Sequence, residues 1–416
     1  MSDFTYKTLP ELELTPVIRS ILDQLEPSNQ DVETAVSLPP DVYTSEEWWE
    51  FERRAIWDRE WVCVGHQGSI LNPGDYFSIN INDEPMLVLK DGEGTIRVMS
   101  AVCQHRGHIL GEASGNATGF TCPFHHWSYD LKGQLRGAPE MEAHASLKEL
   151  RESHCLPQLR TEIWNGFIFV NLDGKAKPLA PRLKRLTAEY APHHMSELHA
   201  SPTMDWADNP WNYKFLQENA IEPYHTAYLH KGPHDFAPSS LASFVEWEDD
   251  DDGAVFHPTG FVELDANFNP DFDYKCRFPV IETLTEKERK RVMFASVMPN
   301  LFMGAVPDGV FYYVMIPQGA NKMTIRVGGL YPEATLAMPD FNELALATIE
   351  GVGVYNDQDT VANSLTHIGL KSRFANRSRY APREKTLSQV NRWLIKRYLA
   401  YAAEFDDTYR VMPKAV

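Results

Sequence analysis

Two short loops that each hold one cysteine and one histidine constrain this 416-residue chain more than any other feature. The first loop carries Cys103 and His105 as C-x-H, and the second carries Cys122 and His125 as C-x-x-H. Thiolates and imidazoles are metal ligands, and four of them can share one metal group only if a rigid scaffold fixes both loops. The sequence therefore predicts a small domain that presents the two loops side by side.

Two kinds of metal group use this set of donors. A Rieske [2Fe–2S] cluster takes two Cys on one iron and two His on the other, whereas zinc takes four donors in a tetrahedron. Zinc fingers usually place both His on one helix, but here each loop mixes one Cys with one His, and Pro123 and Trp127 flank the second pair. The pattern favours the cluster over zinc. His108 and His126 are predicted to be bystanders, because the two motifs already supply four ligands.

Both loops resemble those of the Rieske oxygenases, whose sequences read close to C-x-H-R-G and C-P-Y/F-H-x-W. This resemblance implies that Cys103, His105, Cys122 and His125 hold a Rieske [2Fe–2S] cluster. One difference is His126, where most relatives carry a small residue, usually Gly.

The composition narrows the class of protein. With 39 basic and 58 acidic residues the net charge is −19, which argues against a nucleic-acid partner. Five cysteines in a long chain suggest no disulfide framework, and thiolate ligands need a reducing compartment. Residues 1–14 lack the apolar core of a signal peptide, and no apolar run is long enough to span a membrane. We therefore expect a cytoplasmic protein.

The first part of the chain predicts an arm followed by a β-rich domain. Residues 1–43 are rich in proline and predict an extended arm with one short helix near 17–25. Thr44 and Glu47 form a capping-box pattern ahead of a helix over 48–57, where apolar residues recur at helical spacing. The metal loops are expected at hairpin tips. Strands are expected at Tyr76–Ile81, Met86–Leu89, Ile96–Val102 and Phe167–Leu172.

The second half of the chain mixes strands with two long helices, which is typical of an α+β domain. Strands are expected at Ser243–Trp247, Val292–Val297, Val310–Ile316 and Met323–Leu330, and helices at Asp340–Leu370 and Arg383–Ala403. The acidic run Glu248–Asp252 is expected to form a solvated turn.

A second group of metal-ligand residues lies at His225 and His230. Two His and one carboxylate with open positions form the facial triad that binds non-haem Fe(II) in oxygenases. Residues five apart on a regular helix point about 140° away from one another, so the pair converges only if the helix ends or distorts. Pro223 provides a reason for such a break. Taken alone, the H-x4-H pair is a weak signal, and two structural histidines are the simpler reading.

The segment Asn212–His230 resembles the motif N-W-K…E-N…D/E-x-Y-H-x4-H of Rieske non-haem iron oxygenase α-subunits. Tyr213 stands where Trp is usual, a change that we expect to matter little. The resemblance implies that His225 and His230 ligate iron.

The third ligand implied by the resemblance is a carboxylate ten positions before a Gly-Leu pair. Counting back from Gly369 gives Asp359, with Asp357 as a rival two residues away. Both residues could instead be acidic groups near a helix N-terminus, where negative charge is stabilising.

Glu222 precedes His225 by three residues, so the two side chains are neighbours on a helical face. In the family, the residue at this position connects the mononuclear iron of one subunit to the second Rieske histidine, here His125, of the next. Many ring-dihydroxylating relatives carry Asp here, and Glu is more familiar in the choline, betaine and carnitine oxygenases.

No convincing dinucleotide-binding fingerprint accompanies these motifs. Gly351-Val352-Gly353 is the nearest approach, and no strand–turn–helix unit fits it. Electrons must then come from a separate reductase or ferredoxin, and NAD(P)H would be used only there. The loop at Arg106 is a candidate docking place for that donor.

The resemblance runs from about Leu38 to Ala403 and implies both fold and assembly. It implies an α+β protein with an arm and helix at 1–58 and a small antiparallel β Rieske domain at 59–174. Residues 175–416 would form a helix-grip (START-like) catalytic domain, with an antiparallel sheet and a long C-terminal helix. The implied assembly is a head-to-tail homotrimer, with or without small β-subunits.

The implied activity is that of a terminal mono- or dioxygenase, which uses O2 at a mononuclear Fe(II) to hydroxylate a small organic substrate. Ring hydroxylation in aromatic hydrocarbon catabolism, C–H hydroxylation and oxidative N-demethylation all fit. An electron-transfer Rieske protein without catalytic iron and a zinc-stabilised binding module are the alternatives. Five residues could line the substrate pocket or simply fill the core: Met298, Phe302, Met303, Tyr312 and Tyr313.

Overall fold

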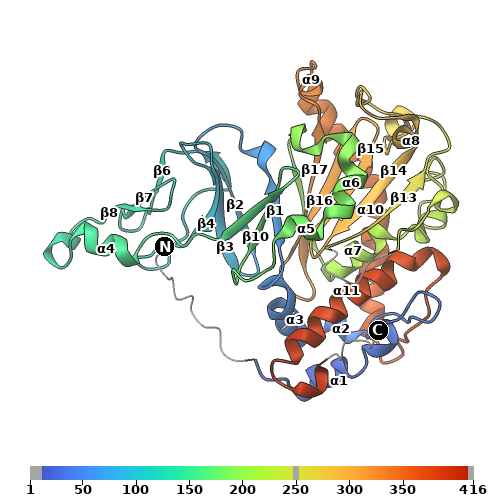
Figure 1. Cartoon of the computed structure of the whole chain (residues 1–416), viewed down its shortest axis with the longest axis horizontal. Helices are drawn as coiled ribbons and strands as arrows, with labels where there is room; N and C mark the ends of the chain where they lie inside the picture. Colours follow the sequence, from blue (N-terminus) through green and yellow to red (C-terminus); the bar gives the residue numbers. More distant parts are fainter. Residues whose placement is uncertain (1–11, 247–252, 411–416) are drawn as a thin grey trace. The chain divides into compact units, whose positions relative to one another are not determined.

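The computed structural model describes residues 12–246 and 253–410. Within them, contacts divide the chain into two compact units. One unit is Cys63–Ala176, and the other combines Glu13–Val62 with the chain from Lys177 onward (Figure 1). Each unit has its own sheets, and each carries one of the two groups of metal-ligand residues.

The first unit consists of small antiparallel sheets and one short helix, α4 (Leu147–Ser153). Its sheets have the strand orders β1-β10-β9, β4-β3-β2-β5 and β6-β7-β8. The strands are β1 (Val62–His66), β2 (Asp75–Ile81), β3 (Glu84–Lys90), β4 (Ile96–Ser100), β5 (Ser114–Asn116), β6 (Gly119–Thr121), β7 (Ser128–Asp130), β8 (Leu135–Gly137), β9 (Arg160–Trp164) and β10 (Phe167–Asn171). The four strands expected in this region are confirmed as β2, β3, β4 and β10.

Two tight hairpins in this unit follow from their turn residues. Asn82 and Asp83 join β2 to β3, and Asn165 and Gly166 join β9 to β10. All four residues have positive φ, which two-residue type I′ turns require and which Asn, Asp and Gly tolerate. A Cβ at Gly166 would also lie 2.1 Å from His66 Nε2, so the turn needs glycine for space as well.

The second unit is built on one antiparallel sheet of seven strands, in the order β11-β17-β16-β15-β14-β13, with β12 paired to β17. The strands are β11 (His199–Ala200), β12 (Met204–Asn209), β13 (Ala254–Gly260), β14 (Arg291–Val297), β15 (Leu301–Val306), β16 (Gly309–Pro317) and β17 (Met323–Tyr331). The helices are α1 (Pro16–Leu22), α2 (Asp41–Thr44), α3 (Glu46–Glu52), α5 (Leu179–Arg182), α6 (Lys184–Tyr190), α7 (Tyr213–Ile221), α8 (Glu286–Arg289), α9 (Glu333–Leu336), α10 (Phe341–Leu370) and α11 (Lys385–Ala402).

Three helices of this unit cover the sheet and position the functional residues. Helix α7 packs against the strands from β13 to β16, α11 packs against β13, and α10 packs against β12 and β17 (Figure 1). Helix α7 also contacts both α10 and α11. The long helices confirm the predictions at 340–370 and 383–403, and the architecture is the expected α+β combination of an antiparallel sheet with long helices.

Two local predictions in this unit are wrong. Thr44 ends α2, and α3 is capped instead by Ser45, whose hydroxyl accepts the Trp48 N–H at 3.1 Å. Ser45 is the residue with extended backbone, and an N-cap must be extended. Residues 243–246 form no strand; Ala242 makes only an isolated bridge to Thr259 of β13. Trp247 and the run Glu248–Asp252 lie outside the described residues.

The arm contributes to the core of the second unit. The expected short helix is α1, which is capped by Thr15 and ends three residues earlier than predicted. Helix α3 continues into a π-helical turn at Arg53–Trp57, so residues 46–57 are helical throughout. Trp48, Phe51 and Trp57 are fully buried. Across the described ranges, no helix combines the length and the apolar character needed to cross a membrane.

Candidate metal centres

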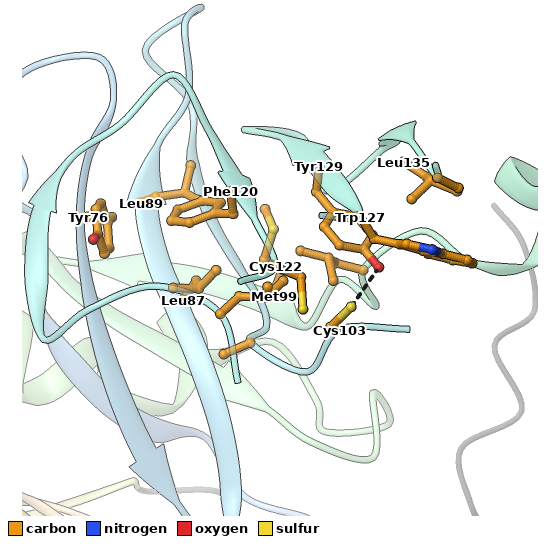
Figure 2. Close-up of a cluster of buried hydrophobic side chains, with 14 of the residues drawn as sticks. Tyr76, Leu87, Leu89, Met99, Cys103, Phe120, Cys122, Trp127, Tyr129 and Leu135 are labelled. Atoms are coloured by element: carbon orange, nitrogen blue, oxygen red, sulfur yellow. Dashed lines mark hydrogen bonds between the residues drawn. The ribbon is translucent and has the colours of Figure 1, made fainter. Parts of the chain in front are cut away.

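Each of the two Cys-His loops follows a strand of the first unit. The loop with Cys103 follows β4 and is closed by a bridge between Val102 and Ile109, and the loop with Cys122 joins β6 to β7. Both cysteines are almost fully buried, within an apolar cluster that includes Trp127 and Tyr129 (Figure 2). The sulfur atoms are therefore shielded from solvent, as a cluster held by thiolates requires.

The structure also brings the two predicted histidines of these loops together. The rings of His105 and His125 have centroids 4.6 Å apart and lie at 79° to one another. His105 stacks on Trp127 with centroids 4.7 Å apart. Nδ1 of His125 is buried and has no hydrogen-bond partner among the described residues, although the ring itself is partly exposed. A buried nitrogen without a partner fits a ligand that faces an iron atom.

Tyr129 is a residue of this centre that the sequence did not indicate. Its hydroxyl oxygen accepts the Gln104 N–H at 3.0 Å and lies 3.4 Å from the sulfur of Cys103 (Figure 2). Because the oxygen already accepts from Gln104, its own hydrogen is left for the sulfur. Hydrogen bonds to the sulfurs help set the reduction potential of an iron–sulfur cluster. The only sequence signal was a tyrosine two residues after Trp127.

The backbone explains the unusual residue next to His125. His126 has a φ of +58°, in the left-handed region that favours glycine, and its side chain is exposed. Glycine adopts this conformation more readily than histidine does. The exposed side chain is consistent with a bystander, which remains a prediction.

The second group of ligand residues depends on where α7 ends. Asn212 caps this helix by accepting the Lys214 N–H, and the helix stops at Ile221, just before Pro223. Glu222 has extended backbone, and His225 begins a short 3-10 turn. The predicted break of the helix is confirmed. Glu222 and His225 are neighbours as expected, but through this turn and not across a helical face.

Three side chains converge beyond this break: His225, His230 and Asp359. Asp359 Oδ1 lies 3.8 Å from His225 Nε2 and 3.2 Å from His230 Nε2. One ligand atom of each residue lies within 4.8 Å of the others, as binding to a common ion requires. Oδ1 of Asp359 is buried and makes no hydrogen bond of normal geometry to a described residue. Two imidazole nitrogens and one carboxylate oxygen are the donor set of the non-haem Fe(II) triad, so the residues fit that ion.

The other nitrogen of each imidazole is already occupied. His225 Nδ1 lies 2.6 Å from Glu222 Oε1, and His230 Nδ1 lies 2.6 Å from Gln358 Oε1. Both oxygens accept, so each Nδ1 carries its hydrogen and each Nε2 is free to bind a metal. Burial lowers the pKa of His225, but Glu222 outweighs it and the net pKa is raised. The sequence did not indicate Gln358, because nothing local shows that it faces His230.

The structure separates the two aspartates that the sequence left as rivals. Asp357 is exposed and lies outside the converging group, whereas Asp359 is buried and belongs to it. Neither is near a helix N-terminus, because α10 begins at Phe341. The alternative of N-terminal charge stabilisation is therefore wrong for both residues.

A cavity opens beside the three converging residues. Six aromatic side chains contribute to its wall: Phe268, Phe294, Phe302, Phe311, Tyr313 and Tyr355. Phe302 and Tyr313 thus line the cavity, which was one of the two alternatives that the sequence left open for them. Met298, Met303 and Tyr312 are buried but do not line the cavity, so they pack in the hydrophobic core.

The expectation that Tyr213 in place of Trp matters little stays a prediction, but the structure gives its hydroxyl a buried partner. Its hydroxyl donates to the buried carboxylate of Glu52 at 2.9 Å, and Lys214 Nζ lies 2.6 Å from the other oxygen. Tyr398 donates to the same carboxylate. The four buried side chains tie α3, α7 and α11 together. The tyrosine hydroxyl therefore has a specific partner at the start of α7, whereas Leu216, Asn219 and Ala220 of the same helix line the cavity.

The fold and the two sites define a protein with two candidate metal centres, one in a small β-rich unit and one in an α+β unit. Comparison with known families is more specific. The model "Ring hydroxylating alpha subunit (catalytic domain)" matches residues 187–400, just over half of the chain, and the "Rieske [2Fe-2S] domain" model matches residues 60–156. The chain belongs to the family of ring-hydroxylating alpha subunits. Its cofactors are a Rieske [2Fe–2S] cluster and a mononuclear iron, and O2 is the co-substrate typical of this family.

Several curated relatives are 30–33% identical to the chain over about half of their own length. The carnitine monooxygenase oxygenase subunit of Acinetobacter pittii is 30% identical over 211 residues, which cover 49% of this chain and 55% of the relative. The benzene 1,2-dioxygenase subunit alpha of Pseudomonas putida is 33% identical over 209 residues, which cover 47% of this chain and 45% of the relative. The matched region thus spans about half the length of these relatives.

Solved structures share the fold over almost the whole chain. A quaternary ammonium Rieske monooxygenase superimposes with a TM-score of 0.74 at 20% identity and covers 91% of this chain and 98% of its own. Naphthalene 1,2-dioxygenase from Rhodococcus sp. gives a TM-score of 0.77 at 19% identity and covers 93% and 99%. The fold is therefore that of Rieske oxygenase alpha subunits.

Proposed function

We propose that this chain is the terminal oxygenase component of a Rieske non-haem iron system. It would take electrons from a separate reductase or ferredoxin and use O2 to hydroxylate a small organic substrate. The observation that carries this proposal is the convergence of His225, His230 and Asp359 at the wall of an aromatic cavity. The match to the catalytic domain supports an oxygenase over a pure electron-transfer protein, and the Rieske match supports the cluster over zinc.

Seven side chains have assigned roles in this proposal. Cys103, His105, Cys122 and His125 would hold the cluster, and His225, His230 and Asp359 would hold the mononuclear iron. When bound, the cluster supplies electrons and the Fe(II) supplies the site for O2 activation, which side chains alone cannot provide.

The remaining residues of the site prepare it for that chemistry. Glu222 and Gln358 fix the two imidazoles by accepting their Nδ1 hydrogens, so both Nε2 atoms face the same point. The aromatic wall excludes water and gives an apolar substrate a surface to pack on. Both actions require only the geometry of this chain.

Glu222 is also proposed as the bridge between subunits of a head-to-tail homotrimer. Nδ1 of His125 is buried while its ring is partly exposed, so the opposite edge of the ring is the accessible one. That edge could donate to Glu222 of a neighbouring subunit. An exposed apolar stripe on one face of α10 supports an assembly: Val354, Val361, Leu365 and Ile368, which are 41–65% exposed.

The electron donor is proposed to dock at the first loop, where Arg106 lies over the exposed ring of Phe124. The relatives are named for two different substrates, carnitine and benzene, so the chemistry of the cavity has to indicate the substrate class of this chain. Aromatic hydrocarbon catabolism is proposed on the resemblance, and a cytoplasmic location is proposed on the composition of the sequence.

The test is the iron content of a matched pair of variants. Wild-type protein should hold about three irons per chain, two in the cluster and one mononuclear. His225→Ala should hold about two, keep the red-brown cluster spectrum and form no hydroxylated product. Asp357→Ala, an exposed neighbour of the third ligand, should behave as wild type. Unchanged iron content in His225→Ala would remove it as a ligand, and colourless wild-type protein made anaerobically with iron would remove the cluster.

A further inference from the structure

The hydroxyl group of Tyr313 lies in the cavity, and the neighbouring hydrogen bonds determine where its hydrogen points. Tyr313 on β16 and Asn356 on α10 both line the cavity and are 5% and 7% exposed. Asn356 Nδ2 lies 2.9 Å from the Tyr313 hydroxyl oxygen. Asn356 precedes Asp359 by three residues, so the pair lies one helical turn from the proposed third iron ligand.

The orientation of the asparagine amide follows from its second contact. Its Nδ2 also lies 3.2 Å from the backbone carbonyl of Val352, which can only accept a hydrogen bond. The amide nitrogen must therefore face both oxygens, and it donates to Tyr313. The hydroxyl of Tyr313 is then the acceptor in this pair, and its own hydrogen points elsewhere.

No described residue accepts that hydrogen. The remaining contacts of Tyr313 are ring contacts with Trp206, Phe302 and Phe311. A buried donor left without an acceptor is unfavourable, so whatever occupies the cavity should satisfy it. Tyr355 differs, because its hydroxyl already donates to the Pro233 carbonyl at 2.7 Å. Tyr313 therefore offers a hydrogen-bond donor to the cavity, and Tyr355 does not.

The charges around the cavity limit what the acceptor can be. Among the described residues that line it there is no Lys or Arg, and two carboxylates, Glu222 and Asp359, are present. The imidazole of His257 is also neutral near pH 7, because burial lowers its pKa to about 4. An anionic group beside Tyr313 would find no cationic side chain, and the proposed iron already has the carboxylate of Asp359 as a ligand. A buried charge without a partner is unfavourable. The acceptor should therefore be uncharged.

We propose that Tyr313, oriented by Asn356, is a specificity-determining residue that donates a hydrogen bond to an uncharged oxygen or nitrogen acceptor on the substrate. The substrate class is a small apolar molecule with one such acceptor, for example a carbonyl, an ether oxygen or a ring nitrogen. This inference rests on the proposed function, because it assumes that the cavity is the substrate site. A plain hydrocarbon would leave the donor without an acceptor, and a carboxylate at this position would find no cationic side chain.

The experiment compares two probes of the same shape, acetophenone and α-methylstyrene, in which a carbonyl replaces a methylene. Their dissociation constants are measured by calorimetry on the anaerobic holoprotein, where no turnover occurs. Wild type should bind acetophenone about three- to tenfold more tightly, the gain expected from one net hydrogen bond. In Tyr313→Phe this ratio should fall to about one, and in Tyr355→Phe it should stay at the wild-type value.

Equal binding of the two probes to wild type, or binding of neither, would overturn the proposal. A preference that survives in Tyr313→Phe would do the same. The content of mononuclear iron, which is held in the unit that carries Tyr313 and Tyr355, verifies that each variant is folded. Failure of the proposed function appears differently, as probes that bind with the expected preference but yield no hydroxylated product when O2 and reductant are added.

Discussion

The two histidines of the mononuclear site share one arrangement, in which an oxygen acceptor holds Nδ1 and Nε2 faces Asp359. The acceptors differ, because Glu222 is an acid and Gln358 is an amide. A neutral acceptor can fix a ring as well as a charged one. The charge on Glu222 therefore needs a second purpose, and the proposed link to a neighbouring subunit would provide it.

Glu222→Gln should separate these two purposes. The amide oxygen can still accept from His225 Nδ1, so the iron content should remain at the wild-type value, while turnover should fall roughly tenfold or more. Gln358→Met is the contrasting variant: it removes the acceptor at His230 and should weaken iron binding by roughly 10- to 100-fold. Iron analysis after dialysis and reductase-driven turnover measure both effects. Near-normal turnover of Glu222→Gln, with product coupled to O2 use, would contradict the bridge.

Sequence motifs predicted the residues that converge on the metal sites, but they did not predict the side chains that hydrogen-bond to those residues. His225, His230 and Asp359 could be predicted because a motif fixes their spacing. Gln358 and Tyr129 could not, because each acts through an oxygen whose direction depends on a distant partner. The orientation of Tyr313 on β16 depends in the same way on the Val352 carbonyl of α10.

At the level of elements, long periodic segments were predicted well and interrupted strands were not. Helix α10 and strands β14, β16 and β17 appear close to their predicted bounds. β13 was missed because it contains Pro258 and Gly260, which usually mark turns, yet an edge strand tolerates proline. β15 was missed because of Gly304, where a Cβ would lie 2.2 Å from the ring of Phe311. That glycine makes room for an aromatic ring of the cavity wall.

The buried carboxylate of Glu52 on α3 pairs with Lys214 on α7. Loss of this cation should lower the stability of the protein. Lys214→Met leaves that carboxylate without its cation and should destabilise the protein by about 3–5 kcal/mol. Adding Glu52→Gln to the same chain should restore a large part of this loss, because the uncompensated charge is gone. Denaturant unfolding measures both values. A double variant that is no more stable than Lys214→Met would contradict a charge-based explanation.

At the scale of the whole molecule, one buried histidine should make the folded state sensitive to acid. His193 is 3% exposed, and neither ring nitrogen makes a hydrogen bond of normal geometry to a described residue. Burial lowers its pKa from 6.5 to about 4, although the nearby Val306 backbone opposes the shift. The unfolded chain then binds a proton that the folded chain does not. This part of the stability is complete above pH 6.5 and is lost as the pH falls toward 4.

His193→Phe should therefore reduce the acid sensitivity of the fold. At pH 5 the histidine should cost about 2 kcal/mol relative to pH 7, and the variant should lose that difference. Denaturant unfolding at the two pH values measures it. His194→Asn is the control: residue 194 has positive φ, which asparagine tolerates, and the side chain is 49% exposed. An unchanged pH dependence in His193→Phe would show that other groups carry the effect.

Helix α10 carries the third proposed ligand, the acceptor for His230 and the asparagine that orients Tyr313, all within one turn. A small tilt of α10 would move Asp359, Gln358 and Asn356 together, and with them the proposed iron ligand, the support of His230 and the orientation of Tyr313. Substitutions on the outer face of α10 do not touch the substrate. They should nevertheless change the position at which the substrate is hydroxylated, although every residue that lines the cavity is kept. Directed evolution of product patterns in this protein should look there first.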